Sequence, residues 1–446
     1  MIEIYIHKNF EQEKKYVFDF LFKDVFGVEY KMFTHTEQNY HIKFGEKIII
    51  ISDKFFSQYQ PGYKYYENSD AIPREYKNTN SVLTPEKDLP VIFGDEKFEI
   101  NQNTAFIGND IVGGIFFMLT LWEEIALKSC RDKHDRFDEK CGFLKKMNLH
   151  RRPLVNEYAE FLWNVLCEMN YNCKRREKKY RVFLTHDIDE FERYGSFIKY
   201  VKALGGDLLK RNSLKKFVET NKDYFNKTIK KENDVFDTFD YFMDIAESKN
   251  LKSHFYFQTG KIGETDVKFD INNKKLRKKI KSILFRGHNV GIHPSYTTYN
   301  DSKQFAEELK RIKNIHPQVS EGRQHFLRFK NPDTWNLWEQ NGLKTDSSIG
   351  YHSDIGFRAG VCHEYPVFDV INRKQLNLVE RPLNIMDTAL IHLSSDKNEL
   401  QEICKNLINT TKKYNGDIVI LWHNSNLKRH EWEGWDKFYE EIVGNA

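Results

Sequence analysis

The chain has few cysteines, little net charge and no apolar run of membrane-spanning length, and each absence excludes a class of protein. Its six cysteines are scattered over 446 residues without a C-x-x-C pair, so neither a zinc knuckle nor a disulfide scaffold is indicated. Lysine and arginine (69) nearly balance aspartate and glutamate (65), which argues against a general nucleic-acid binder. The apolar run from Ile111 to Leu121 falls short of the ~20 residues that cross a bilayer. We therefore expect no nucleic-acid partner and no membrane span.

The N-terminus and the bulk composition indicate a folded protein of the cytoplasm. Apolar and polar residues alternate from Ile2 to Ile6 with early charges, which predicts a strand rather than a signal peptide. With 40% hydrophobic and 30% charged residues, the chain can bury a sizeable core, and its length favours two domains. Aromatic residues reach 15%. Most of them are expected in the core, and others could line a sugar-binding cleft.

Residues 1–175 predict a small mixed α/β domain of unknown role. Besides the strand at Ile2–Ile6, the expected elements are a helix at Glu11–Phe26, strands at Lys47–Ile51 and Val91–Phe93, a loop at Ser57–Ser69, a helix capped by Asp110 that runs through Trp122, a charged loop at Arg131–Asp138, and a helix that Pro153 opens and that ends near Leu166. The basic stretch Lys174–Lys179 is the predicted boundary.

Residues 180–446 predict a second α/β domain, because strands and helices alternate there as in a mostly parallel sheet or barrel. The expected strands are Tyr180–Leu184, His254–Gln258, Asn289–Ile292 and Asp417–Trp422, and the expected helices are Leu276–Phe285, Ser302–Lys313 and segments between Phe197 and Ser248.

Two carboxylates follow the first of these strands. In the run Leu184-Thr185-His186-Asp187-Ile188-Asp189 the acids lie two positions apart, at a strand end that faces the active site in parallel α/β folds. Two acids so close raise each other's cost of ionisation unless a cation joins them or one accepts a proton. The alternative is a plain loop in which Asp189 caps a helix.

Two further strands end in histidine, the commonest neutral ligand for a divalent metal. His293 follows the segment Gly287-His288-Asn289-Val290-Gly291-Ile292. His423 follows Ile418-Val419-Ile420-Leu421-Trp422, and it could act as a general acid. A hydrogen-bonded structural histidine is the alternative at both positions.

The segment Gly322–Phe329 alternates polar residues with others along an expected strand. This pattern would point Arg323 and His325 to one side, where an arginine near the acids could orient a catalytic carboxylate. Ordinary surface patterning gives the same alternation.

The order of these motifs, from about Tyr180 to the C-terminus, resembles the polysaccharide deacetylase superfamily, also called carbohydrate esterase family four or the NodB-homology fold. The resemblance implies an incomplete α/β barrel and a bound divalent metal, for which zinc is expected. Asp187 matches the family's catalytic base and Asp189 its metal-binding aspartate. His293 matches the first histidine of the His-x-x-x-His motif.

The resemblance also assigns residues around the base. Arg328, in Leu327-Arg328-Phe329-Lys330-Asn331-Pro332, resembles the arginine that steadies it. Asp346 resembles the acid that touches this arginine, and His423 matches the late histidine that acts as general acid. The expected second metal histidine is replaced by Thr297, so the third ligand is left open among His325, His254, His288, His186 and a water.

The N-terminal half carries a resemblance of its own. The segments Phe116–Glu124 and Asp132–Phe137 resemble an uncharacterised domain that precedes deacetylase-like domains in bacterial proteins of surface-polysaccharide loci. The aromatic part of this match is also explained by helix packing alone.

These features predict a metal-dependent hydrolase that removes an N- or O-acetyl group from a sugar. Arg323, Trp335, Tyr351 and Trp422 are the candidate substrate-binding residues, the last three as platforms for a sugar ring. Thr297 favours the alternative, a non-catalytic carbohydrate-binding or scaffold protein. An aspartate-based phosphatase is disfavoured, because Phe191 stands where such enzymes need a hydroxyl residue.

Overall fold

The computed structural model describes residues 1–60, 62–260, 268–428 and 432–446. Its first sheet begins with β1 (Ile2–His7), in which alternation buries Ile2, Ile4 and Ile6 on one face. The six strands of this sheet run in the order β2-β1-β3-β4-β8-β7. The other five are β2 (Tyr30–His35), β3 (Tyr40–Phe44), β4 (Lys47–Ile51), β7 (Gly94–Ile100) and β8 (Thr104–Asn109). A separate pair, β5 (Lys77–Thr79) and β6 (Leu89–Val91), takes the place of the strand predicted at Val91–Phe93.

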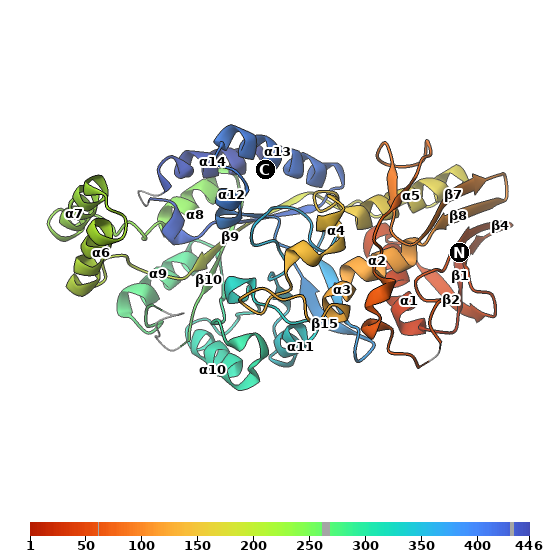
Figure 1. Cartoon of the computed structure of the whole chain (residues 1–446), viewed down its shortest axis with the longest axis horizontal. Helices are drawn as coiled ribbons and strands as arrows, with labels where there is room; N and C mark the ends of the chain where they lie inside the picture. The colour runs from red at the N-terminus through yellow and green to blue at the C-terminus, as the bar shows by residue number, and fades with distance from the viewer. Residues whose placement is uncertain (61, 261–267, 429–431) are drawn as a thin grey trace.

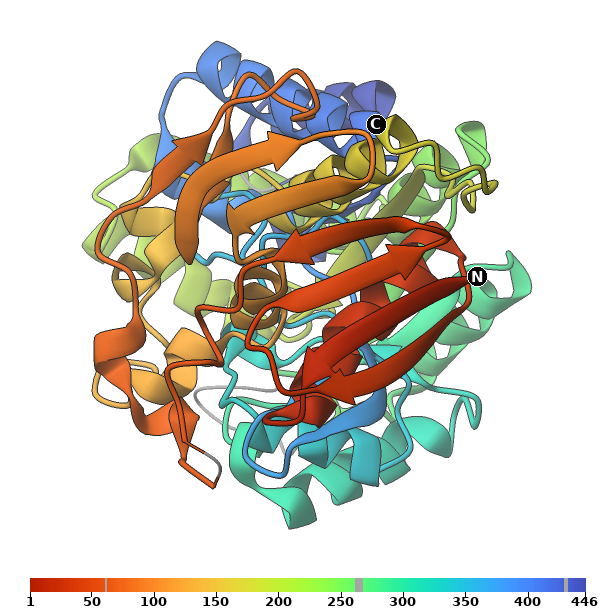
Figure 2. The ribbon, with the colours of Figure 1, turned by 90° about the vertical axis from the view of Figure 1, so that its right-hand side faces the viewer.

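Helices cover one face of this sheet, and its other face is turned to the viewer in Figure 2. The helix predicted at Glu11–Phe26 is confirmed as α1 (Glu11–Phe18), which continues as a π-helix over Asp19–Phe26. Asp110 caps α2 (Ile111–Leu119) by accepting a hydrogen bond from the Gly113 amide at 2.8 Å.

The helix predicted to run through Trp122 is interrupted. Leu121 is left-handed, with φ of 49°, and a second helix, α3 (Trp122–Ala126), begins after it. Further along are α4 (Phe143–Lys146) and α5 (Leu154–Glu168), which Pro153 precedes as predicted. The loop predicted at 57–69 contains a short 3₁₀ turn at Tyr65–Glu67, and its residue 61 lies outside the described residues.

The second half forms a nine-stranded sheet in the order β14-β15-β13-β12-β11-β10-β9-β17-β16. Its strands are β9 (Arg181–Ile188), β10 (Ser253–Phe257), β11 (Asn289–Ile292), β12 (Glu321–Gly322), β13 (Thr345–Asp346), β14 (Tyr365–Asp369), β15 (Lys374–Glu380), β16 (Ile385–Met386) and β17 (Asp417–Leu421). Every neighbouring pair is parallel except β14 with β15. Because β14 and β16 form the two edges and no pairing joins them in the described part, the sheet is open and closure into a barrel is not shown.

Helices connect the parallel strands, as the alternation predicted. They are α6 (Phe197–Leu209), α7 (Leu214–Thr228), α8 (Phe239–Ser248), α9 (Lys274–Phe285), α10 (Ser302–Lys313), α11 (Asp333–Gln340), α12 (Asp387–Leu393) and α13 (Lys397–Lys413), and α14 (Trp435–Asn445) follows the last strand. Figure 1 shows α6 and α7 projecting at the end of the molecule opposite the N-terminal sheet. None of the described helices is long and apolar enough to cross a bilayer.

Two predictions about the strands of this half were wrong in detail. Strand β9 extends to Ile188, so Asp187 lies within the strand rather than after it. The expected strand over 322–329 is replaced by the two-residue β12 and a 3₁₀ turn at His325–Leu327. Phe326 and Leu327 have positive φ values of 61° and 51°, which end the extended backbone there.

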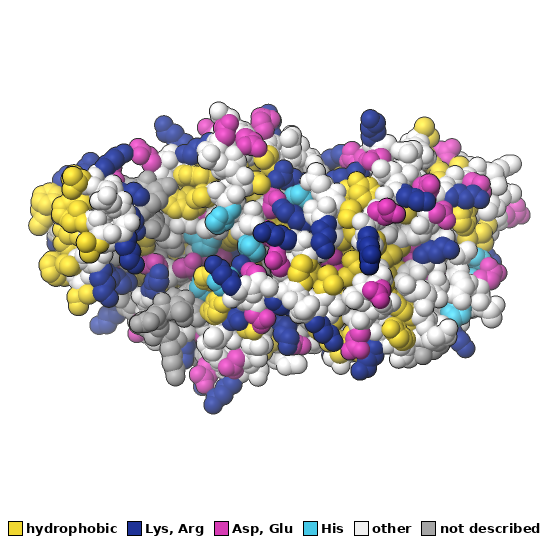
Figure 3. All heavy atoms as spheres, in the orientation of Figure 1, with side chains coloured by type: hydrophobic (Ala, Val, Ile, Leu, Met, Phe, Trp, Pro, Cys, Tyr) yellow, Lys and Arg dark blue, Asp and Glu magenta, His cyan; other side chains and the backbone are white. Residues whose placement is uncertain are grey.

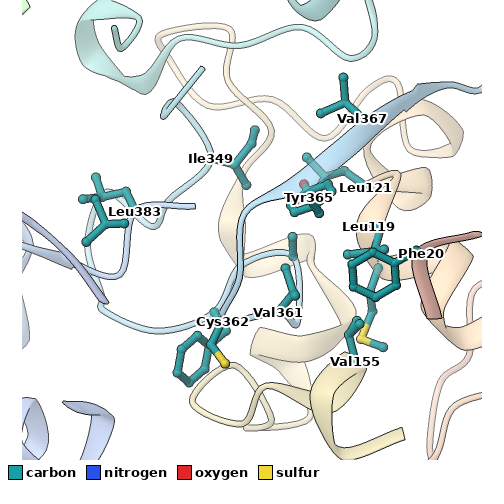
Figure 4. Close-up of a cluster of buried hydrophobic side chains, with 14 of the residues drawn as sticks. Phe20, Leu119, Leu121, Val155, Ile349, Val361, Cys362, Tyr365, Val367 and Leu383 are labelled. Carbon is teal, nitrogen blue, oxygen red and sulfur yellow. The ribbon is translucent and has the colours of Figure 1, made fainter. Parts of the chain in front are cut away.

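The core runs without interruption across residue 175. In Figure 4, Phe20, Leu119 and Val155 of the N-terminal half pack beside Val361 and Tyr365 of the C-terminal half. The division into domains at 1–175 and 180–446 therefore stays a prediction, although each half contains its own sheet.

The cysteines form one disulfide that was not predicted, and they build no disulfide scaffold. Cys130 and Cys141 form a disulfide that encloses the charged loop predicted at Arg131–Asp138. Their separation of eleven residues matches no short motif, so no pattern in the sequence indicates the pairing. Cys167, Cys173, Cys362 and Cys404 are free.

Candidate active site

The polar motifs meet at one edge of the nine-stranded sheet. Asp187 is near the end of β9, His293 directly follows β11, and His423 lies two residues beyond β17. Carboxyl ends of parallel strands share one edge, which is why residues more than a hundred positions apart come together here. Figure 3 shows histidine side chains gathered near the middle of the face seen in Figure 1.

Asp189, His293 and His325 form a group that could hold a metal ion. Their three ligand atoms lie within 4.8 Å of one another. Asp189 Oδ1 is 3.3 Å from Nε2 of His293 and 3.6 Å from Nε2 of His325. Ligands bound to zinc at ~2.0–2.1 Å in tetrahedral geometry stand about 3.3 Å apart, so the spacing and the donor types fit such an ion.

The surroundings of His293 prepare it as a ligand. Its Nδ1 lies 2.6 Å from the backbone carbonyl of Arg323, so Nδ1–H donates there and Nε2 is left for the metal. Burial lowers the pKa of His293, but the carboxylates of Asp187 and Asp189 outweigh it and raise the pKa above the usual value, so a metal ion at Nε2 would take the place of a proton there. For Asp189, burial raises the pKa, but the neighbouring His325 and His293 lower it well below its usual range.

The other candidates for the third ligand have partners elsewhere. His254 pairs with Glu321, and His288 accepts a hydrogen bond from the Ser253 amide. His186 is fully buried, with its Nδ1 3.0 Å from the Trp422 carbonyl. Thr297 is exposed and donates to Gln304. A second group with metal-ligand donors, His35, Glu37 and His41, lies at the turn between β2 and β3.

Arg323, rather than the predicted Arg328, holds Asp187. The Arg323 side chain is fully buried and its NH1 donates to Asp187 Oδ1 at 2.9 Å. Its other nitrogens donate to the backbone carbonyl and the hydroxyl of Ser347, at 2.8 and 2.9 Å. These bonds hold the guanidinium group of Arg323 in place beside the Asp187 carboxylate. Arg323 is thus too enclosed to be the substrate-binding residue that we predicted.

Arg328 lies apart from Asp187 because the turn at 325–327 redirects the chain. It donates to the backbone carbonyls of His134 and Tyr296, at 2.6 and 2.9 Å, and stacks on the rings of Tyr296 and Tyr299. The predicted contact of Asp346 with Arg328 is also absent from the described contacts. Asp346 is fully buried, where burial raises its pKa to about 7, and it accepts a hydrogen bond from Ser348.

His423 is paired with an aspartate that the sequence analysis missed. Its Nδ1 is 2.7 Å from Oδ1 of Asp387, a fully buried residue, and its Nε2 is 3.9 Å from Asp189. Burial lowers the pKa of His423, but the Asp387 carboxylate outweighs it and raises the pKa to about 10. The only available signal was an acid directly after the short apolar segment Ile385–Met386.

These residues surround a cavity of about 510 Å³ whose wall comes from both halves of the chain. Lys133, His134 and Arg136, from the disulfide-closed loop, line it together with His293 and His423. Arg136 anchors this loop by donating to the Phe326 carbonyl at 2.8 Å, and it pairs with Asp132. The contribution of the N-terminal half to the site was not predicted.

The predicted sugar platforms do not face this cavity. Trp335 and Trp422 are fully buried, and Tyr351 is 5% exposed. Trp335 donates to Glu380 and Trp422 to the Asn426 carbonyl, so both are core residues. Among the described residues, Phe326 is the aromatic side chain that lines the cavity with substantial exposure, 43%.

The site therefore combines a two-histidine, one-aspartate ligand group with a buried carboxylate–arginine pair and a histidine–aspartate pair.

A family of unknown function, DUF7033, matches residues 2–171, the region that contains the uncharacterised-domain motifs. No curated protein matches the chain.

Solved structures give weak similarities. One from Mycobacterium smegmatis, described as a "putative polysaccharide deacetylase", is 14% identical over 60% of this chain and 85% of its own, with a TM-score of 0.36. One from Bordetella bronchiseptica, described in the same words and as involved in O-antigen biosynthesis, is 14% identical over 60% of this chain and 91% of its own, with a TM-score of 0.30. Similarities of this strength do not bear on activity, so the proposed function rests on the side chains of the site.

Proposed function

We propose that the chain is a metal-dependent hydrolase that removes an acetyl group from an N- or O-acetylated sugar, and that its open sheet is an incomplete barrel of the polysaccharide deacetylase type. The observation that carries this proposal is the arrangement of Asp189, His293 and His325 beside Asp187 and His423 around one cavity. A divalent ion bound there, with zinc expected, would lower the pKa of a bound water and stabilise negative charge on the acetyl oxygen.

The chain's own residues account for the proton transfers. Asp187 accepts the proton of the attacking water, and Arg323 holds this carboxylate in position by its hydrogen bond. The water oxygen bonds to the acetyl carbon, and the bond from that carbon to the sugar nitrogen or oxygen breaks. His423, which Asp387 keeps protonated at neutral pH, donates a proton to the departing amine or alcohol. Acetate and the free sugar group are the products.

The disulfide-closed loop would bind the part of the sugar that lies away from the acetyl group. Lys133, His134 and Arg136 offer hydrogen-bond donors on that wall of the cavity, and Phe326 offers an apolar face. We assign the substrate to bacterial surface-polysaccharide metabolism as part of the same proposal. Thr297 no longer favours a non-catalytic binding protein, because His325 supplies a third donor.

Elemental analysis of bound metal tests the proposal first. Protein purified without chelator should carry one ion that is lost from Asp189→Ala/His293→Ala and from His325→Ala, and retained in Thr297→Ala, the matched control. His41→Ala, measured in parallel, identifies any ion held by the second ligand group.

Acetate release from a panel of acetylated sugars tests the chemistry. Wild-type protein should release acetate, and Asp187→Asn should lower the rate by at least about 10³-fold, as expected for loss of the general base and the alignment it provides. A wild-type protein that binds no zinc after soaking, or an Asp187→Asn variant with full activity, would overturn the mechanism.

A further inference from the structure

Helices α6 and α7 form a hairpin whose polar residues are turned inward. Tyr200 donates to Asn221 at 2.6 Å, and Thr220 donates to Asp207 at 2.7 Å. Asp207 and Thr220 are the only residues of the two helices that are buried. The contact between the helices is therefore held by hydrogen bonds and by the stacking of Tyr200 on Tyr224, at 3.8 Å between ring centroids.

The apolar residues of the hairpin face solvent. Nine of the eighteen large apolar side chains that are strongly exposed in the described part of the chain lie within its 33 residues from 197 to 229. They are Phe197, Ile198, Val201, Leu208, Leu209, Leu214, Val218, Phe225 and Ile229. Figure 3 shows hydrophobic side chains gathered at the left end of the molecule, where Figure 1 places α6 and α7. An exposed apolar patch of this kind marks a surface that contacts something else.

The hairpin is also strongly basic. Residues 196–232 contain ten lysines and arginines and four acidic residues, a net charge of +6. The whole chain has a net charge of +4, so the remainder is slightly negative. Positive charge is therefore concentrated on the same projecting element as the apolar side chains.

We propose that this hairpin binds the surface of an anionic lipid bilayer. Apolar side chains would enter the boundary between headgroups and acyl chains while lysines contact anionic headgroups, the pattern of interfacial amphipathic helices. The helices have 13 and 15 residues, so each would lie on the bilayer without crossing it. The tip between them presents Leu209 and Leu214, which are 87% and 74% exposed.

The position of the hairpin links the membrane to the candidate active site. Ser196 lies seven positions after Asp189, so their Cα atoms are at most about 25 Å apart. Bilayer binding would bring the cavity close to the membrane surface. Resting on the proposed function, this geometry favours an acetylated sugar that is attached to a lipid.

Co-sedimentation of the full chain with vesicles tests the proposal without any assay of activity. The probes are vesicles of 30% phosphatidylglycerol in phosphatidylethanolamine, and vesicles of phosphatidylcholine alone. Wild-type protein should bind the anionic vesicles, and raising the salt from 0.05 to 0.5 M should weaken the binding. Leu209→Ser/Leu214→Ser should lower the affinity at least tenfold, about 1.4 kcal/mol. Phe285→Ser is the matched control, because Phe285 is 93% exposed on α9 and should leave binding unchanged.

Two outcomes would overturn the proposal. One is wild-type protein that stays in the supernatant with both kinds of vesicle. The other is a Leu209→Ser/Leu214→Ser variant that binds as tightly as wild type. Light scattering decides what covers the hairpin in the first case: a dimer that this variant dissociates would assign the surface to a second copy of the chain. Metal content and acetate release are measured separately, so failure of membrane binding leaves the proposed hydrolase untouched.

Discussion

Replacement of Arg323 by methionine should destabilise the protein far more than the same change at Arg328. Arg323 is fully buried and pairs with Asp187, which is itself only 2% exposed. Removing one partner of such a pair leaves an uncompensated buried charge and costs about 3–5 kcal/mol. Arg328 is partly buried, and it donates to backbone carbonyls and stacks on two tyrosines, so Arg328→Met should cost about 1–2 kcal/mol.

Urea unfolding in the presence of a chelator measures these differences without a contribution from metal. A double-mutant cycle of Arg323→Met with Asp187→Asn isolates the pair, and its coupling energy should exceed about 1.5 kcal/mol. Equal losses of stability for Arg323→Met and Arg328→Met would refute the assignment. A coupling energy below about 0.5 kcal/mol would also refute it, because the effects of independent substitutions add to within that amount.

Three further predictions concern the His423–Asp387 pair, the buried His186 and the Cys130–Cys141 disulfide. Asp387→Asn should lower the pKa of His423 from about 10 toward its ordinary value, as followed by NMR titration of the imidazole. Burial lowers the pKa of His186 to about 3, so the contribution of this residue to stability should fall as the pH drops below 6.5. Between pH 7 and 5, the free energy of unfolding measured in urea should fall by about 2 kcal/mol less for His186→Gln than for wild type. Cys130→Ser/Cys141→Ser should lower the free energy of unfolding by about 3 kcal/mol, because the disulfide closes a loop of about twelve residues.

Each of these predictions has a control or a contradicting result. An unchanged His423 titration in Asp387→Asn would mean that another group sets its charge. The sign for His186 follows from the unfolded chain binding more protons than the folded one between the two pKa values, and a parallel pH dependence in wild type and His186→Gln would contradict it. For the disulfide, Cys167→Ser is the matched control, because Cys167 is free and exposed.

The sequence predicted the edge of the sheet at which the site forms. Asp187, His293 and His423 each follow an apolar segment, and parallel strands bring their carboxyl ends together whatever the intervening chain does. Local pattern was sufficient for this, because each strand is specified by its own short run of residues.

What the sequence did not predict depends on single backbone angles and on distant contacts. The choice between Arg323 and Arg328 follows from the positive φ of Phe326, which no alternation pattern reveals. Asp387 follows a strand of two residues, too short to show a period. The loop that lines the cavity comes from the other half of the chain and is held there by Arg136, whose bond to the Phe326 carbonyl is a non-local contact.

The order of the nine-stranded sheet has a consequence for how the chain folds during synthesis. Strand β9, which carries Asp187, lies between β10 and β17, so one of its two neighbours is made only when residue 421 leaves the ribosome. The N-terminal sheet is complete by residue 109 and can form much earlier. A nascent chain would therefore carry an unpaired edge of β9 for more than two hundred residues, and closing so long a loop is slow. We expect truncation before Asp417 to give aggregation rather than a stable shorter protein.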